Sequence, residues 1–144
     1  MGYSFSKTSA SRLATCHEDL QKIANLAIKV SAVDFGIAEG HRSIERQKML
    51  YAAGKSKIDG TTKKGKHNYD PSLAFDVYAY VKGKASYSER DLCYIGGVMK
   101  ACAEILHDQG MIYHKLRWGG NWDGDGQIVT DQGFIDLPHF ELIA

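Results

Sequence analysis

Apolar residues recur at the spacing of a helix in three parts of the chain. Residues 17–30 carry acidic side chains in the first turn, and their apolar residues fall on one face: Leu20, Ile23, Ala24, Ala27 and Ile28. Residues 43–54 and 88–110 each begin at a serine and end at a glycine, which are favoured at the two ends of a helix. The pattern therefore predicts three helices, the longest with a weak point at Gly96-Gly97.

Alternating apolar and polar residues predict strands around these helices. The clearest case places Leu73, Phe75 and Val77 on one face of a strand and Asp76 on the other. The expected strands are 33–40, 73–81, 115–118 and 138–143. Helices and strands are mixed without a regular βαβ alternation, which favours an α+β fold.

Length and composition describe an ordinary globular protein. The 144 residues suit a single domain, 1–144, and the net charge of +1 gives no reason to expect nucleic acid as a partner. Three cysteines leave an odd thiol under any pairing, so we expect synthesis in a reducing cytosol. Neither a signal peptide nor a run approaching roughly 20 apolar residues is visible, so we expect no stable association with a membrane.

The loop at residues 55–72 has little periodicity and is rich in basic side chains: Lys55, Lys57, Lys63, Lys64 and Lys66. A loop this long inside a compact domain is usually functional or disordered. Clustered lysines favour an anionic polymer as ligand, and the alternative is that they are solvated charges of a surface loop.

Three polar residues suggest a metal site. Asp76 lies in the middle of a predicted strand, where a carboxylate is costly if it is buried without a partner. His67 precedes it in the loop, and His139 follows Asp136 in the segment DLPHFEL (136–142), whose Pro138 cannot donate to a sheet. Two imidazoles and one carboxylate are the composition of a catalytic zinc site with an open position. Spacing alone leaves open that these residues are dispersed and never meet.

Three motifs, in order along residues 39–142, resemble those of the zinc D-Ala–D-Ala peptidase superfamily. KHNYDPSLAFDV is similar to its first metal motif, and RWGGNWDGDG followed by DLPHFEL is similar to its second. EGHRSIERQ is similar to its Gly-Tyr-Arg-Ser segment, although residue 41 is histidine here where tyrosine is common. The second metal motif also departs from the family pattern, because residue 121 is asparagine where aspartate is common. The resemblance implies a small antiparallel sheet with flanking helices, the fold shared with Hedgehog-type domains.

The resemblance also implies roles for individual residues. His67, Asp76 and His139 would bind zinc, which would activate a water molecule whose proton Asp136 would accept. Arg42 would hold a substrate carboxylate or the developing oxyanion, and the alternative is a surface residue capping the helix after Ser43. Further expected substrate contacts are Ser43, Gln47 and Trp118. Trp118 and Trp122 could each line the cleft or fill the core, and the sequence leaves both alternatives open.

Among the branches of this superfamily, the chain is most similar to phage endolysins that act as L-alanyl–D-glutamate endopeptidases. Asp136 stands where the dipeptidase branch usually has glutamate. Such an enzyme would be made in the host cytoplasm, would reach peptidoglycan through a phage pore, and would act as a monomer. The alternatives are a D,D-carboxypeptidase or D,D-dipeptidase, and a non-catalytic binding module, which would not need Asp136.

A second ion is the remaining metal hypothesis. Asn121, Asp123 and Asp125 follow the first positions of a calcium-binding EF-hand loop, but position twelve is Gln132, which lacks the required carboxylate. The alternative is a glycine-rich turn. Of the other histidines, His17 and His107 are expected at the surface, and His41 and His114 are assigned no role.

Overall fold

A computed structural model describes residues 2–125 and 135–144. Its helices are α1 (Lys7–Leu13), α2 (Glu18–Val30), α3 (Ile44–Ala52), α4 (Glu89–Asp108) and the 3-10 turn η1 (Lys66–Asn68). Its strands are β1 (Asp34–Glu39), β2 (Ala74–Val81), β3 (Lys84–Ser86), β4 (Lys115–Gly119) and β5 (Asp136–Ile143). Every predicted helix and strand is present, and the α+β class is confirmed.

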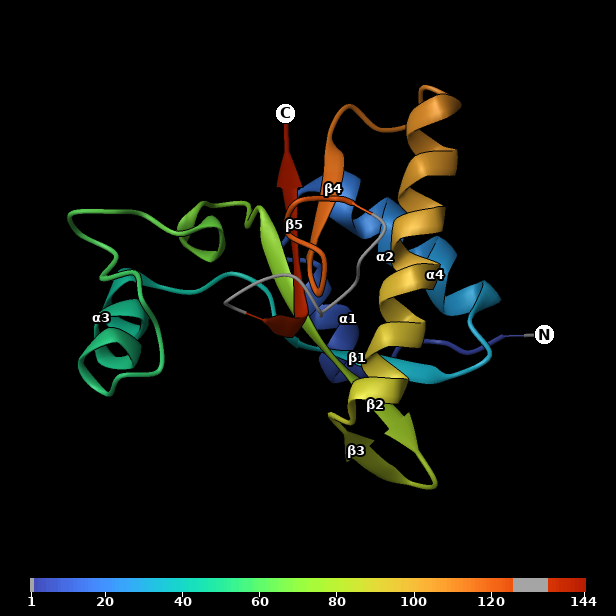
Figure 1. Ribbon diagram of the computed structural model, residues 1–144, viewed down its shortest axis with the longest axis horizontal. Coiled ribbons are helices and arrows are strands. Elements are labelled where there is room, and N and C mark those ends of the chain that lie inside the picture. The colour runs from blue at the N-terminus through green and yellow to red at the C-terminus, as the bar shows by residue number, and fades with distance from the viewer. Residues whose placement is uncertain (1, 126–134) are drawn as a thin grey trace.

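The strands form one antiparallel sheet in the order β1-β2-β5-β4, with the short β3 paired to β2. Helix α4 packs on β2, β4 and β5, and α2 packs on α4. Figure 1 shows α2 and α4 on one side of the sheet and α3 with the following loop on the other. The sheet therefore has one face against the core and one face toward α3.

The register of the sheet decides which side chains reach each face. Asp76 of β2 lies opposite His139 of β5, and Arg117 of β4 lies opposite Glu141 of β5. The residues between them point the other way, because successive side chains of a strand alternate. Those residues fill the core: Phe75, Val77, Leu116, Phe140 and Leu142. One alignment of β2, β5 and β4 therefore decides both which apolar side chains are buried and which polar side chains share the opposite face.

Pro138 lies within β5, although β5 has a neighbour on each side. The β4–β5 pairing shifts between Trp118 and Gly119, so that Trp118 faces Phe140 whereas Gly119 faces Asp136. Pro138 therefore has no partner in the register with β4, and the pairing with β2 ends at His139. Its missing N–H costs no ladder hydrogen bond, which is how a strand interior tolerates proline.

The glycines expected to weaken α4 do not interrupt it, since the helix runs without a break from Glu89 to Asp108. A Cβ atom on Gly96 would lie 2.4 Å from Cε2 of Trp118. Gly96 is therefore a contact surface for the indole of Trp118, and the helix gains close packing on β4 in exchange for the lower helix propensity of glycine.

Three elements were not predicted: α1, β3 and the short turn η1 inside the long loop. Only Ser9 and Leu13 are buried in α1, so it has no apolar stripe to signal a helix. Its polar side chains bind the edge of the sheet instead: Ser9 Oγ accepts from Ile37 N at 3.0 Å and Arg12 Nη1 donates to Ile37 O at 3.0 Å.

No helix in residues 2–125 or 135–144 has the length and apolar character needed to cross a bilayer.

Candidate active site

His67, Asp76 and His139 meet on the face of the sheet turned toward α3. Asp76 Oδ1 lies 3.1 Å from His139 Nδ1 and 3.4 Å from His67 Nε2. One potential ligand atom from each residue lies within 4.8 Å of the others. The sequence left open that the three residues are dispersed, and the structure brings them together.

The segment around Gly40 and Arg42 holds His67 in place. His67 Nδ1 lies 2.8 Å from Gly40 O, Arg42 N donates to His67 O at 2.8 Å, and Asn68 Nδ2 donates to Arg42 O at 3.0 Å. Because a carbonyl only accepts, Nδ1 of His67 carries the hydrogen and Nε2 of the neutral ring carries a lone pair. The segment that resembles a substrate-contacting motif is therefore also the support of His67.

The lone pair of His67 fits a metal ligand. Nε2 is buried and has no hydrogen-bond partner among the residues that the structure describes. A buried polar atom left in this way is costly, and such atoms in native structures usually have a partner. A cation beside Asp76 would satisfy it, with nitrogen and carboxylate donors of the kind that bind zinc.

Burial and hydrogen bonding give the two aspartates of the site different acidities. Burial by itself would raise the pKa of Asp76, but the hydrogen bond with His139 and the approach of His67, at 3.4 Å, hold that pKa well below its usual range. Burial, and then the charge of Asp76, raise the pKa of Asp136. A carboxyl group of raised pKa in the same cleft is suited to accept and return a proton.

A cleft of about 550 Å³ runs from these residues to α3 and the lysine-rich loop. Asp136 and Trp122 line it together with the three candidate ligands. The ring of Trp122 lies 5.6 Å from that of His139, between ring centroids. Of the two alternatives for Trp122, the structure supports the one in the cleft.

Trp118, in contrast, lies in the core. Its side chain is buried, Nε1 donates to Leu137 O at 2.8 Å, and the ring stacks on Phe140. A substrate in the cleft cannot reach it, so the structure does not retain Trp118 as a substrate contact. The sequence could not separate the two tryptophans because both belong to one glycine-rich motif.

Arg42 lines the cleft, but its guanidinium is engaged within the protein. It donates to Glu39 through Nε and Nη2 and to Gln47 Oε1 through Nη1 at 3.0 Å, and Nη2 lies 3.7 Å from Asp76 Oδ2. In this arrangement Arg42 orients Asp76. A contact between Arg42 and substrate stays a prediction.

Ser43 and Gln47 have structural roles in the observed arrangement. Ser43 Oγ accepts from Arg46 N at 3.1 Å and caps α3. Gln47 is 2% exposed, and its Nε2 donates to Ser56 Oγ and Ile58 O. Ser43 therefore holds the start of α3, and Gln47 fastens α3 to the loop. Contacts of these two residues with substrate stay predictions.

The sequence missed Glu141, which lies beside His139. Its Oε1 is 2.8 Å from His139 Nε2, and its Oε2 accepts from Arg117 Nη2 at 2.7 Å. The available signal was the alternation of β5, because residues two apart on a strand share a face and a glutamate between Phe140 and Leu142 has to point toward His139.

The calcium hypothesis stays a prediction. Asn121 Nδ2 donates to Asp125 O at 2.7 Å and Asp125 N donates to Asp123 Oδ1 at 3.2 Å, which describes a turn. Within the described part of the chain, neither aspartate joins a group of three acidic, histidine or cysteine side chains. Gln132, at position twelve of the expected loop, falls outside the described residues.

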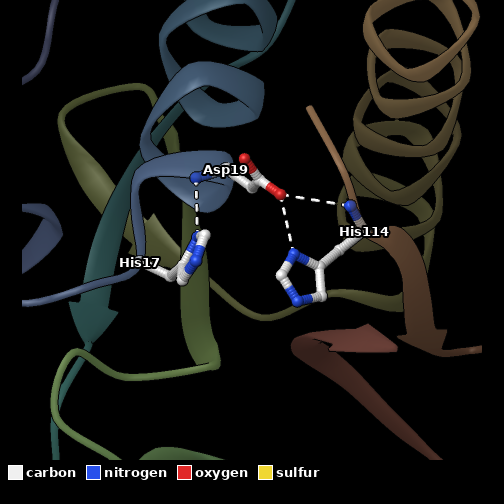
Figure 2. Close-up of side chains that lie close together, drawn as sticks. All are labelled: His17, Asp19 and His114. Carbon is white, nitrogen blue, oxygen red and sulfur yellow. Dashed lines mark hydrogen bonds and ion pairs between the residues drawn. The ribbon is translucent and has the colours of Figure 1, made fainter. Parts of the chain in front are cut away.

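A second group of this kind, His17, Asp19 and His114, has a structural role (Figure 2). Asp19 is buried, and its Oδ2 accepts from the backbone N–H groups of Tyr113 and His114 and lies 2.7 Å from His114 Nδ1. His17 Nδ1 accepts from Asp19 N at 2.9 Å and caps α2. Because that bond leaves the hydrogen of the neutral His17 ring on Nε2, His17 has no lone pair free for a metal. His114, which had no assigned role, helps fasten the segment before β4 to α2.

We expect Asp19→Asn to destabilise the fold by about 1–3 kcal/mol at neutral pH, because two buried N–H groups and an imidazole lose a charged acceptor. Burial alone would raise the pKa of Asp19, but the hydrogen bonds from His114 and Tyr113 lower it overall. A lowered folded-state pKa stabilises the fold above the unfolded value of about 3.9, and this contribution is lost as the pH falls through the folded value.

Urea unfolding at several pH values measures this effect. The difference between wild type and Asp19→Asn should shrink as the pH falls below about 4. Asp108→Asn, at an exposed position on α4, is the control and should change stability by no more than about 0.5 kcal/mol. Equal stability of wild type and Asp19→Asn at neutral pH would contradict the structural role.

The sheet, the cleft and the converging side chains are those of the peptidase class that the sequence motifs predict. The chain belongs to the phage L-alanyl-D-glutamate peptidase family, which it matches over residues 1–143. It is 31% identical to the L-alanyl-D-glutamate peptidase of Escherichia phage T5, over 99% of this chain and all of that protein. It is also similar to the crystal structure of the L-Ala D-Glu endopeptidase ChiX of Serratia marcescens, with a TM-score of 0.75 and 28% identity, over 97% of this chain and 90% of that one. The family resemblance and the fold expected from it are confirmed.

Proposed function

We propose that this protein is a zinc-dependent endolysin that hydrolyses the L-alanyl–D-glutamate bond in the stem peptides of bacterial peptidoglycan. Membership of the family supports the bond, as do the names of the T5 and ChiX peptidases. The observation that carries the zinc is the buried, unpartnered Nε2 of His67 beside Asp76 and His139.

His67, Asp76 and His139 would hold the metal ion. A zinc ion bound there would polarise the scissile carbonyl and lower the pKa of a water molecule. The carboxylate of Asp136 accepts a proton from the attacking water and returns it to the nitrogen of the leaving amine. Asp76, held ionised by its neighbours, offers the negative charge that a cation requires.

The lysines of the long loop support an acidic substrate. All five line the cleft: Lys55, Lys57, Lys63, Lys64 and Lys66. One of them, Lys66, also donates to Leu142 O at 2.9 Å and therefore ties the loop to β5. Stem peptides carry carboxylates, so the basic side of the cleft complements them.

We further propose that the protein is synthesised in the host cytoplasm, reaches the bacterial cell wall through a phage pore, and acts as a monomer.

Mass spectrometry of digested, purified peptidoglycan tests the proposed bond. Cleavage between L-alanine and D-glutamate exposes the amine of D-glutamate, and we expect fragments that begin at this residue. Release of D-alanine without such fragments would instead support the D,D-peptidase alternative and overturn the proposal. The Asp136→Ala variant, assayed in parallel, controls for contaminating hydrolases and should release no fragments.

A further inference from the structure

Glu141 is a buried carboxylate next to a candidate metal ligand, and it has no part in the chemistry described above. It is 7% exposed. Its Oε1 lies 2.8 Å from His139 Nε2, and its Oε2 accepts from Arg117 Nη2 at 2.7 Å and from Arg117 Nε at 3.2 Å. Burial of a carboxylate is costly unless it is paired and hydrogen-bonded, and Glu141 uses both of its oxygens for this purpose.

We propose that Glu141, itself oriented by Arg117, is a positioning residue that fixes the tautomer and the ring orientation of His139, so that Nδ1 is the atom presented to the metal. This inference rests on the proposed function, because it assigns a role toward the zinc ion that His67, Asp76 and His139 would hold.

The hydrogen-bond geometry determines the tautomer. An ionised carboxylate can only accept, so His139 Nε2 must donate to Glu141. Nδ1 lies 3.1 Å from Asp76 Oδ1, and although burial would lower the pKa of His139, Asp76 and Glu141 raise it to about 9, so the ring carries hydrogen on both nitrogens while no metal is bound. A cation held beside Asp76 would displace the hydrogen of Nδ1, whereas the hydrogen of Nε2 would stay on the bond to Glu141. The opposite tautomer would place an N–H group where a ligand is needed and a lone pair against the carboxylate of Glu141.

The two candidate histidine ligands are held by different kinds of acceptor. His67 is held by the backbone carbonyl of Gly40, at 2.8 Å from Nδ1, which no side-chain substitution removes. His139 is held by a side chain, and the sheet places that side chain. Residues 139 and 141 share a face of β5, and Arg117 lies directly opposite Glu141 on β4. Of the two histidines, it is therefore His139 whose ring support a side-chain substitution can remove.

The affinity of the purified protein, residues 1–144, for zinc tests this role, by competition with a chromophoric chelator after the metal has been removed. Partners that orient metal-binding histidines typically contribute about 10–100-fold to metal affinity. We expect Glu141→Ala to weaken zinc binding by this amount. Glu141→Gln should weaken it at least as much, although it is nearly isosteric.

The glutamine variant separates positioning from packing. Its side chain has one acceptor oxygen, whereas Arg117 and His139 each need an acceptor. If the oxygen faces Arg117, the amide N–H group faces His139 and favours the tautomer with hydrogen on Nδ1. If Glu141 only filled space beside Arg117, the nearly isosteric glutamine would be tolerated better than alanine, and zinc affinity would not change.

Glu104→Gln is the matched control, because it removes the same charge from an ion pair, with Lys115 at 3.0 Å, that does not touch the cleft. Its zinc affinity should equal that of wild type. Zinc binding by folded Glu141→Gln as tight as that of wild type overturns the inference. A wild-type protein that binds no zinc overturns the proposed function itself, so the two failures are distinguishable.

A measurement on wild type serves if the variants do not fold. Long-range nitrogen–proton NMR spectra of the zinc-loaded protein report which ring nitrogen of His139 carries hydrogen. We expect hydrogen on Nε2 and the metal on Nδ1. The reverse assignment would overturn the inference without the use of any variant.

Discussion

His67→Ala is expected to abolish both zinc binding and peptidoglycan hydrolysis. The substitution removes the ligand whose Nε2 is otherwise buried without a partner, and it leaves only Asp76 and His139. Metal ions in hydrolases contribute several kcal/mol to stabilisation of the transition state, so the rate should fall by about a thousandfold or more. Elemental analysis of the purified protein and turnover of purified peptidoglycan measure the two effects.

The control for this prediction is His107→Ala, at a histidine near the end of α4 and away from the cleft. It should retain the zinc content and the rate of wild type. Removal of zinc from wild type with a chelator should reproduce the defect of His67→Ala, and added zinc should restore only wild type. Full activity of folded, zinc-free His67→Ala would show that the reaction does not use this site.

Asp136→Asn is expected to lower the rate by about 10²–10⁴-fold, because an amide of the same shape cannot accept a proton. Unlike His67→Ala, it should leave zinc binding intact, since Asp136 is assigned to proton transfer and not to the metal. The measurement is kcat on purified peptidoglycan, together with the zinc content of the same preparation.

Zinc content distinguishes the roles of the two residues. Loss of metal from Asp136→Asn would assign Asp136 to the ligand set, and an unchanged kcat would remove it from the reaction. Asp123→Asn, at an exposed aspartate outside the cleft lining, is the matched control and should behave as wild type in zinc content. A change of activity in that variant that depends on calcium would support the second metal hypothesis.

The sequence predicts those elements of the fold that have strong apolar periodicity or clear end signals. The apolar stripe of α2 and the serine and glycine at the ends of α4 were sufficient, and both helices lie within two residues of the expected bounds. Helix α1 was not predicted because it is held by polar contacts. Ser9 and Arg12 form hydrogen bonds with the edge strand β1, and such contacts leave no periodic pattern of apolar residues in the sequence.

The candidate site, like the fold, could be predicted only in part from the sequence. His67, Asp76, His139 and Asp136 could be proposed from their motifs, because side chains with specific chemistry stand out from the sequence around them. Whether a tryptophan faces the core or the cleft depends on packing against Gly96, which lies more than twenty positions away, and Trp118 was misplaced for that reason. Glu141 was missed because its importance comes from its neighbour across the sheet, Arg117, and not from any motif.

The antiparallel pairing of β2 with β5 couples stability to chemistry in this protein. A slip of β5 by one residue would turn Phe140 and Leu142 toward solvent and His139 into the core, because side chains alternate along a strand. The transfer of apolar side chains out of water therefore selects the single alignment in which the candidate ligands meet. A substitution that keeps Phe140 and Leu142 apolar therefore also keeps the alignment that brings Asp76 and His139 together.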